Sequence, residues 1–288
     1  MKFKQLYQQG PRLSCEFFPP KTDQGEKNLW RCLDELKKLD PAYFSVTYGA
    51  GGSTQDRTKN IVTQIKERTG VEAVAHLTCV GSSSEQLGAL LDDYAQAGMT
   101  HILALRGDKP EDQASFQVEK SGFAHATALV RLIAKTHADF AVAVATYPEG
   151  HPESKHGLDD DIRYLKMKQD EGATLAITQY FFDNEVFYRF RDKAVAAGVN
   201  LPIIPGIMPI LNFTQIKRFS AMCGTSIPVS LHDKMTPVED DLDAVKAIGI
   251  AVATAQCADL LKHDVAGLHF YTLNKADATC QIVKVLGL

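Results

Sequence analysis

The sequence predicts an α/β fold, specifically a single-domain (β/α)₈ barrel over residues 1–288, because strand-like and helix-like segments alternate along its whole length. The strand-like runs are almost continuously apolar, as expected where helices cover a parallel sheet outside and side chains fill the barrel inside. Glycines follow four helical runs at the position that favours a left-handed cap, namely Gly70, Gly98, Gly172 and Gly198. An open doubly wound sheet is the alternative that the same alternation allows.

Eight apolar runs are predicted to be strands. They are Leu13–Phe18, Tyr43–Tyr48, Ala73–Cys79, Ile102–Leu105, Phe140–Thr146, Leu175–Gln179, Ile203–Ile207 and Gly267–Thr272. Segments of helical period lie between them, at Asn28–Leu39, Thr58–Arg68, Glu85–Ala97, Ala126–Thr136, Asp161–Glu171, Val186–Ala196 and Phe213–Met222. The strand count is the number that an eight-stranded barrel requires.

An extra helix is predicted before the last strand. Thr236–Glu239 has the layout of a capping box, and Pro237 stands at the first helical position. We therefore expect a long added helix to begin there and to end near Lys262.

Composition limits the possible functions. The chain has 45% hydrophobic residues, 23% charged residues and a net charge of −4, which gives no basic surface for nucleic acid or for an anionic membrane. No run approaches the roughly 18 consecutive apolar residues of a membrane span, and Met1–Arg12 lacks the apolar centre of a signal peptide. The six cysteines form no C-x-x-C pair, so neither a disulfide framework nor a zinc site is expected. We expect a cytoplasmic protein, and no appended regulatory domain after Leu288.

Glu16 is the first candidate functional residue, because it lies inside the apolar run Ser14–Phe18 that two prolines end. A carboxylate in such surroundings is costly unless it is paired, hydrogen-bonded or protonated. One interpretation is a structural pair with an Arg or Lys. The other is a catalytic acid whose pKa is raised by Phe17 and Phe18, and its place on the first strand favours this one, because barrel enzymes build their sites at strand ends.

Polar groups also end most of the other predicted strands. They are Thr47 and Tyr48, His76, Arg106–Asp108, Tyr147, Gln179 and Tyr271. A barrel mouth lined in this way suits a large polar ligand that bears aromatic rings.

Two further motifs have competing interpretations. Gly49–Ser53 follows a strand and precedes a helix, so it is either a phosphate-binding loop or an ordinary βα loop; it does not match G-x-G-x-x-G. His151 and His156, with Glu149 and Glu153, superficially resemble metal ligands. Prolines at 148 and 152 break the helix that such a site would need, so no metal is expected.

An ordered set of motifs resembles the bacterial methylenetetrahydrofolate reductases. The set is Ser14–Pro20, Ser45–Ala50, Asp56–Thr58, His76–Cys79, Ala104–Asp108, Tyr147–Glu153, Ile177–Asp183, Pro205–Pro209 and His269–Asn274. The likeness runs from about Leu13 to about Cys280. One motif alone is weak evidence, but the ordered set is specific.

The resemblance implies non-covalent FAD, with NADH and methylenetetrahydrofolate using one face of the flavin in turn. By position, the FAD contacts would be Tyr48, Ala50, His76, Arg106, Gly107, Asp108, Ala124, Tyr147, His151, Asp161 and Lys168. The NADH and folate side would be lined by Thr47, Gln179, Gln215, Phe219, Tyr271 and Lys275. Lys275 departs from the Arg of the family pattern, so its grip on a folate carboxylate would be looser. The segment Lys109–Phe123 also departs from that pattern, which affects the alignment of Ala124.

The implied reaction reduces 5,10-methylenetetrahydrofolate to 5-methyltetrahydrofolate, a step of one-carbon metabolism toward methionine. NADH reduces FAD and leaves, and the folate then accepts hydride. Glu16 is the candidate donor of the proton to folate N10. Asp108 would tune the flavin potential, or would simply pair with Arg106. We expect a homo-oligomer, and the sequence leaves NADH against NADPH open.

Two other classes share the predicted fold. One is a flavin barrel that oxidises an amine, like a proline dehydrogenase, which needs no buried acid on the first strand. The other is a pterin-binding barrel without redox chemistry, such as a methyltransferase component. Bound yellow flavin would exclude the second.

Overall fold

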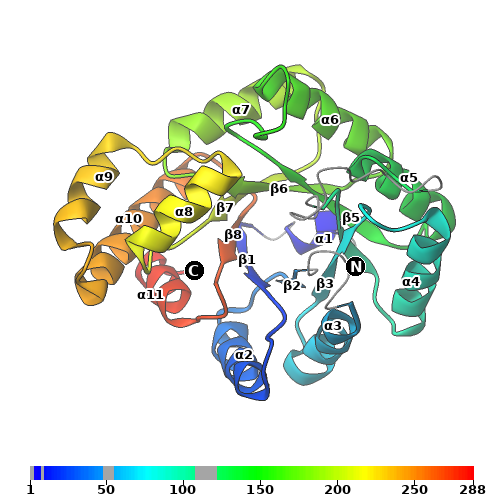
Figure 1. Ribbon diagram of the computed structural model, residues 1–288, viewed down its shortest axis with the longest axis horizontal. Helices are drawn as coiled ribbons and strands as arrows, with labels where there is room; N and C mark the ends of the chain where they lie inside the picture. The colour runs from blue at the N-terminus through cyan, green and yellow to red at the C-terminus, as the bar shows by residue number, and fades with distance from the viewer. Residues whose placement is uncertain (1–2, 8–9, 48–54, 108–121) are drawn as a thin grey trace.

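Eight parallel strands form a closed barrel in the order β1 to β8, and β8 pairs with β1 (Figure 1). The computed structural model describes residues 3–7, 10–47, 55–107 and 122–288, with the backbone alone for Lys4 and residues 55–57. The strands are β1 (Arg12–Phe17), β2 (Phe44–Val46), β3 (Ala73–Thr78), β4 (His101–Leu105), β5 (Ala141–Thr146), β6 (Leu175–Tyr180), β7 (Ile203–Ile207) and β8 (Gly267–Tyr271). The barrel prediction is confirmed, and closure excludes the open sheet.

Helices surround the barrel on its outside (Figure 1). They are α2 (Asp23–Leu36), α3 (Gln55–Thr69), α4 (Ser84–Gln96), α5 (Ala126–Thr136), α6 (Leu158–Asp170), α7 (Asn184–Ala196), α8 (Phe213–Cys223) and α11 (Asp277–Leu286). The four predicted cap glycines all have positive φ, from 73° at Gly70 and Gly98 to 118° at Gly172. Apolar faces of these helices and the outward residues of the strands form the largest buried cluster, which includes Leu33, Ile65, Leu91, Ile133 and Leu165.

The extra helix before β8 is present, but it begins later than predicted. α9 (Val229–Met235) and a 3₁₀ turn, η3 (Thr236–Val238), precede α10 (Leu242–Lys262). The N-cap of α10 is Asp241, whose carboxylate accepts from the backbone N–H groups of Asp243 and Ala244 at 3.1 Å each. Thr236 instead donates its hydroxyl to the carbonyl of His232 and so belongs to the end of α9.

By length and composition α10 is also apolar enough to cross a membrane. That is weak evidence, because core helices of barrel proteins pass the same test. Here α10 packs on α11, α7 and α9, which are neighbours of the barrel.

A short N-terminal helix, α1 (Phe3–Leu6), was not predicted. Phe3 is fully buried and packs edge-on against Tyr43 and His101, 5.5 and 4.9 Å between ring centroids. His101 is the first residue of β4, so α1 lies at the amino ends of the strands. Phe3, Leu6 and Tyr7 belong to the cluster that fills the barrel interior, with Val74, Leu103, Ile177 and Ile204. The opposite, carboxyl end is left for a site.

Candidate active site

Glu16 points into the barrel, and its apolar sequence neighbours point away from it. Successive strand residues face opposite sides. Leu13, Cys15 and Phe17 belong to the cluster between strands and helices, whereas Ser14 and Glu16 face inward. Phe18 lies beyond the strand and is 44% exposed. The expectation that Phe17 and Phe18 enclose the carboxylate was therefore wrong.

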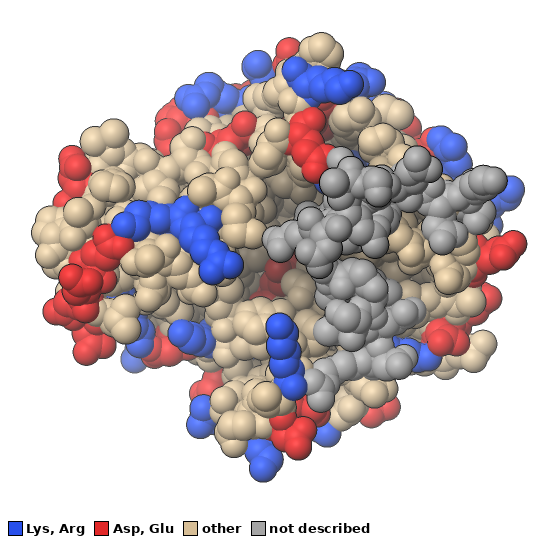
Figure 2. Space-filling model, viewed as in Figure 1, with Lys and Arg blue, Asp and Glu red and all other residues tan. Residues whose placement is uncertain are grey.

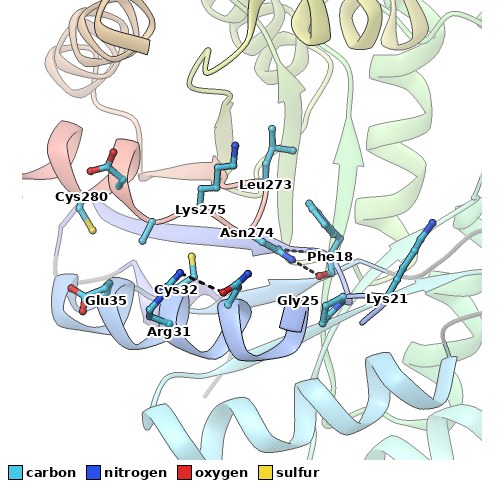
Figure 3. Close-up of a pocket in the computed structure, with 14 residues that line it drawn as sticks. Phe18, Lys21, Gly25, Arg31, Cys32, Glu35, Leu273, Asn274, Lys275 and Cys280 are labelled. Atoms are coloured by element: carbon cyan, nitrogen blue, oxygen red, sulfur yellow. Dashed lines mark hydrogen bonds between the residues drawn. The ribbon is translucent and has the colours of Figure 1, made fainter. Parts of the chain in front are cut away.

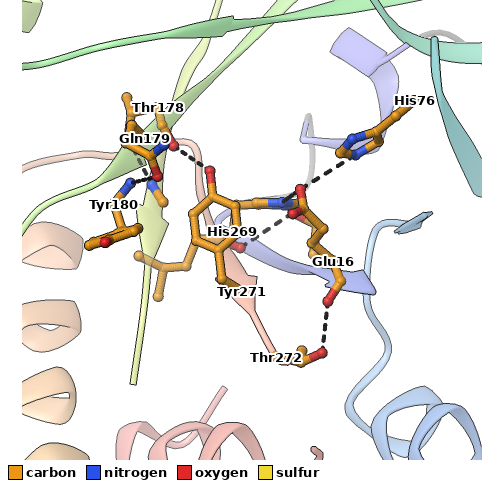
Figure 4. A network of polar contacts seen from close by, with 11 residues as sticks. Glu16, His76, Thr178, Gln179, Tyr180, His269, Tyr271 and Thr272 are labelled. Carbon is orange, nitrogen blue, oxygen red and sulfur yellow. Dashed lines mark hydrogen bonds and ion pairs between the residues drawn. The ribbon is translucent and has the colours of Figure 1, made fainter. Parts of the chain in front are cut away.

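Two histidines flank the Glu16 carboxylate (Figure 4). Its Oε2 atom lies 3.4 Å from Nε2 of His76, on β3, and 3.5 Å from Nε2 of His269, on β8. The Glu16 side chain is 17% exposed, while those of His76 and His269 are 5% and 0% exposed. No Arg or Lys ion pair reaches Glu16 within the described part of the chain. The structural pair with an Arg or Lys, which competed with the catalytic interpretation, is absent there.

The pKa of Glu16 is lowered, not raised as the sequence suggested. Burial is the largest single influence and raises it, but the positive charge that His76 carries when protonated and the hydrogen bond and charge of His269 together outweigh burial. Burial lowers the pKa of His76, so its ring is neutral at pH 7. The lowered pKa favours the ionised form of the Glu16 carboxyl group in the ligand-free chain.

Tyr271, on β8, reaches over Gly206 of the neighbouring strand β7 to β6. Its hydroxyl donates to the carbonyl of Thr178 on β6 at 2.7 Å (Figure 4). Gly206 makes this possible, because a Cβ there would lie 2.7 Å from the Tyr271 ring and 2.3 Å from the Thr178 carbonyl oxygen. Gln179, predicted on the same wall, uses its side-chain oxygen to accept from the backbone N–H of Tyr180 at 3.0 Å, which leaves its amide NH₂.

Arg106 and Gly107 lie at the end of β4. The Arg106 guanidinium forms a bidentate pair with Glu153, at 2.6 and 3.1 Å. Gly107 has a φ of 87°, and a Cβ there would lie 2.8 Å from Val80, so only glycine suits this turn. Tyr147 packs edge-on against His151, 4.6 Å between centroids, and His151 accepts from the Glu153 backbone at 3.0 Å.

Asp161 and Lys168 place opposite charges on α6. The Asp161 carboxylate accepts from the backbone N–H of His151 at 2.7 Å and from the Ser154 hydroxyl at 2.9 Å. Lys168 donates to the carbonyl of Ala145, on β5, at 2.7 Å. Burial lowers the pKa of Lys168 to about 8, and Asp161 partly opposes that shift. Five predicted FAD contacts, Arg106, Tyr147, His151, Asp161 and Lys168, thus gather on the β4–β5–α6 side.

The predicted residues of α8 lie beside the mouth. Gln215 and Phe219 are four residues apart and share one face of the helix. Gln215 is exposed, and its backbone N–H is capped by Asn212. Phe219 packs in a cluster with Tyr180, Tyr271 and Leu273. Phe219 and Tyr271 therefore both pack against one buried cluster beside the mouth.

Lys275 stands apart from the barrel interior. It lines a cavity of about 790 Å³ between α2 and the connection from β8 to α11 (Figure 3). Lys21 and Arg31 line the same cavity. Asn274 ties its rim to β1, accepting from the Phe18 N–H at 3.1 Å and donating to the Phe18 carbonyl at 2.9 Å.

Several predicted residues remain to be placed. Thr47 follows β2, is half-buried and accepts at its carbonyl from Thr58 at 3.2 Å. Ala124 is exposed before α5. Tyr48, Ala50, Asp108 and the loop Gly49–Ser53 lie outside the described residues.

In the space-filling view the molecule is hollowed near its middle, and acidic and basic side chains are interspersed over the visible face (Figure 2).

The histidine and carboxylate groups after β5 have protein partners. Glu149 accepts from the backbone N–H of Ser226, Glu153 pairs with Arg106, and Nδ1 of His151 is occupied. Across the ranges that the structure describes, no three His, Cys, Asp or Glu side chains converge as metal ligands.

Sequence reasoning missed Ser14 and His269. They are register partners on adjacent strands, and Ser14 Oγ lies 2.8 Å from His269 Nδ1. The signal was the strand alternation itself, because Ser14 stands two residues before Glu16 and His269 two before Tyr271. Each pair therefore shares the inward face.

The comparisons with known proteins agree with one another. The profile of the family described as methylenetetrahydrofolate reductase matches residues 2–287. The 5,10-methylenetetrahydrofolate reductases of Pectobacterium carotovorum subsp. carotovorum and Escherichia coli (strain K12) are each 42% identical over 276 residues, covering 96% of this chain and 90% of theirs. Methylenetetrahydrofolate reductase (NADH) 1 of Arabidopsis thaliana is 39% identical over 297 residues, 100% of this chain and 50% of its own.

A solved structure shares the fold. An uncharacterized protein from Clostridium thermocellum, described as binding two copies of 5-methyl-5,6,7,8-tetrahydrofolic acid, superposes with a TM-score of 0.67 over 98% of both chains at 15% identity. The family match over nearly the whole chain and the 42% identity confirm the resemblance seen in the motifs. This chain belongs to the methylenetetrahydrofolate reductase family.

Proposed function

We propose that this chain reduces 5,10-methylenetetrahydrofolate to 5-methyltetrahydrofolate with NADH as reductant and FAD as bound cofactor. The observation that carries the proposal is Glu16, an inward-facing carboxyl group between two imidazoles at the barrel mouth. A family of oxidoreductases that opens a folate ring needs a proton donor at the folate, and Glu16 is the acid that we propose for this role. We further propose a homo-oligomer in the cytoplasm, each chain one catalytic domain.

The donor set fits FAD. Arg106 and Lys168 place positive charge on one side of the mouth, which suits a pyrophosphate. Ser45 Oγ is buried and has no hydrogen-bond partner in the described part of the chain, so a polar group of the cofactor would satisfy it. When bound, FAD would supply the hydride carrier between NADH and folate.

Glu16 would act on N10 of the folate. A donor must be protonated, and the ligand-free pKa of Glu16 is lowered. Burial already pushes that pKa upward more than any other single influence. A pterin ring over the 17% of the side chain that is exposed would remove the remaining water and strengthen this push. Folate binding would thus favour the protonated form of Glu16 that the reaction requires.

Other residues would orient the two substrates. Phe219 and Tyr271, which pack against one cluster, would each offer a ring on which nicotinamide or pterin stacks in turn, and the side-chain NH₂ of Gln179 would donate to either ring. Lys275 would hold a folate carboxylate at the rim as a single point charge. Asp108 is proposed to tune the flavin potential, and Asp108→Asn should shift the midpoint potential positively.

The experiment is anaerobic titration of the purified yellow protein. NADH should bleach the flavin absorbance, and 5,10-methylenetetrahydrofolate should then restore it with formation of 5-methyltetrahydrofolate. An oxidised product of proline catabolism is the control and should not restore it. Protein without flavin, or bleached protein that folate leaves reduced, would contradict the proposal. Repeating the first step with NADPH measures the nucleotide preference.

A further inference from the structure

Glu16 lies one residue from the end of β1, where the regular strand pairing stops. The pairing with β8 ends with Glu16 opposite Tyr271, and the pairing with β2 ends at Phe17. Neither neighbouring strand therefore pairs with Phe18. The residues after it, Pro19–Pro20, have no N–H group with which to continue a ladder. A strand end in this position frays unless another group holds it.

Two side chains from the connection after β8 take over where the ladder ends. Thr272 is buried and donates its hydroxyl to the carbonyl of Glu16 at 2.7 Å (Figure 4). The Asn274 amide accepts from the N–H of Phe18 at 3.1 Å and donates to the Phe18 carbonyl at 2.9 Å (Figure 3). One side-chain amide thus does for Phe18 what a paired strand residue does with its backbone. The backbone N–H of Asn274 donates to the Thr272 hydroxyl at 3.2 Å, which joins the two side chains into one clamp.

The backbone of this connection adopts an uncommon conformation. Leu273 and Asn274 both have positive φ, 51° and 57°. Asn tolerates the left-handed region, whereas a bulky side chain such as that of Leu is unfavourable there. Such a backbone persists only where surrounding contacts fix it, and it is found most often at functional sites. The hydrogen bonds of Thr272 and Asn274 with the end of β1 supply such contacts.

We propose that Asn274 is a positioning residue that fixes the end of β1 through Phe18 and thereby holds the Glu16 carboxyl group in place for proton transfer. Phe18 is only two residues from Glu16, so release of its backbone lets the strand end move. A displacement of about 1 Å at a reacting group can slow a reaction about 100-fold. The inference rests on the proposed function for the role of Glu16, but the clamp itself does not require turnover.

Asn274→Gly is the informative variant, because glycine accepts the positive φ and removes only the amide group. Amide hydrogen exchange of Phe18 is measured by NMR on protein labelled with ¹⁵N-phenylalanine, and its signal is identified by its loss in Phe18→Leu. The Phe18 N–H should exchange at least about fivefold faster in Asn274→Gly than in the wild type, the value of one hydrogen bond. Equal exchange rates in the two proteins would overturn the clamp.

The two half-reactions supply the second measurement. Asn274→Gly should slow flavin reoxidation by 5,10-methylenetetrahydrofolate about tenfold and leave reduction by NADH within about twofold of the wild type. Added to Glu16→Gln, the same change should slow reoxidation no further, because the acid that it positions is already gone.

Losses that multiply in the double variant would overturn the proposal, since Asn274 would then act through another group, such as the adjacent Lys275. Equal slowing of both half-reactions by Asn274→Gly would overturn it as well, because a general loss of structure affects both steps.

Asn200→Gly is the matched control. Its side-chain NH₂ donates to the carbonyl of Gly198 at 3.2 Å, in the loop between α7 and β7 at the amino end of the barrel. This variant should leave the Phe18 exchange rate and both half-reactions as in the wild type. If the wild type lacks folate reduction, the proposed function fails, and the exchange of the Phe18 amide still decides whether Asn274 holds the end of β1.

Discussion

At the scale of single residues, the pKa of a side chain depends on its neighbours in space and not on its neighbours in the sequence. Glu16 is adjacent in the chain to Cys15 and Phe17, yet both pack against helices, and its actual neighbours come from β3 and β8. Its polar type and strand position could be recognised from the sequence. The direction of its pKa could not, because that depends on two histidines that are 60 and 253 residues away in the chain.

Lys168 carries a prediction about pH. Its folded pKa is about 8, below the ordinary 10.5, so between these values the unfolded chain binds more protons than the folded one. The unfolding free energy should therefore rise with pH from about 8 to about 10.5 by on the order of 1–3 kcal/mol. Lys168→Met should lack this rise, and urea unfolding without added flavin at several pH values measures the difference.

Lys166 on the same helix is the control for that measurement, since its side chain is 34% exposed and its ammonium group pairs with Asp170. The unfolding free energy of Lys166→Met should rise with pH as that of the wild type does. Parallel curves for the wild type and Lys168→Met would refute the buried-amine account.

At the scale of elements, ranges were predictable and several boundaries were not. The ranges of β7 and α5 were predicted to the residue. The start of α10 was placed at Thr236, where the capping-box pattern is stronger than at Asp241. Thr236 instead caps the end of α9, where its hydroxyl donates to the carbonyl of His232.

The two candidate caps give a prediction for α10. Asp241→Ala should lower the unfolding free energy by about 1 kcal/mol, because two backbone N–H groups lose their acceptor. Thr236→Ala should change it by less than about 0.5 kcal/mol. Chemical denaturation of both variants decides between the caps, and the opposite ranking would restore the sequence-based helix start.

At the scale of the whole molecule, the alternation of elements predicted the barrel and its single mouth, because eight parallel strands with covering helices have one economical closure. It did not predict how the other end is filled. α1 has only four residues, too few for a periodic pattern, and its role appears only when the strands around it are in place.

Phe3 tests this closure of the amino end. Phe3→Ala should lower the unfolding free energy by about 3–5 kcal/mol, because a fully buried ring between Tyr43 and His101 leaves a cavity. Val285, an apolar residue that is 71% exposed on α11, is the matched control, and Val285→Ala should cost less than about 0.5 kcal/mol. Thermal or urea unfolding gives both values, and a cost below 1 kcal/mol for Phe3→Ala would show that α1 does not support the barrel.

The most direct measurement of the central claim is stopped-flow kinetics of Glu16→Gln, with each half-reaction followed separately under anaerobic conditions. The amide keeps the size of the side chain and cannot donate the required proton. Reoxidation by methylenetetrahydrofolate should slow by about 10²–10⁴-fold, while reduction by NADH should stay within about twofold of the wild type. Equal losses in the two half-reactions, or folate reduction at the wild-type rate, would contradict the assignment of Glu16 as the proton donor.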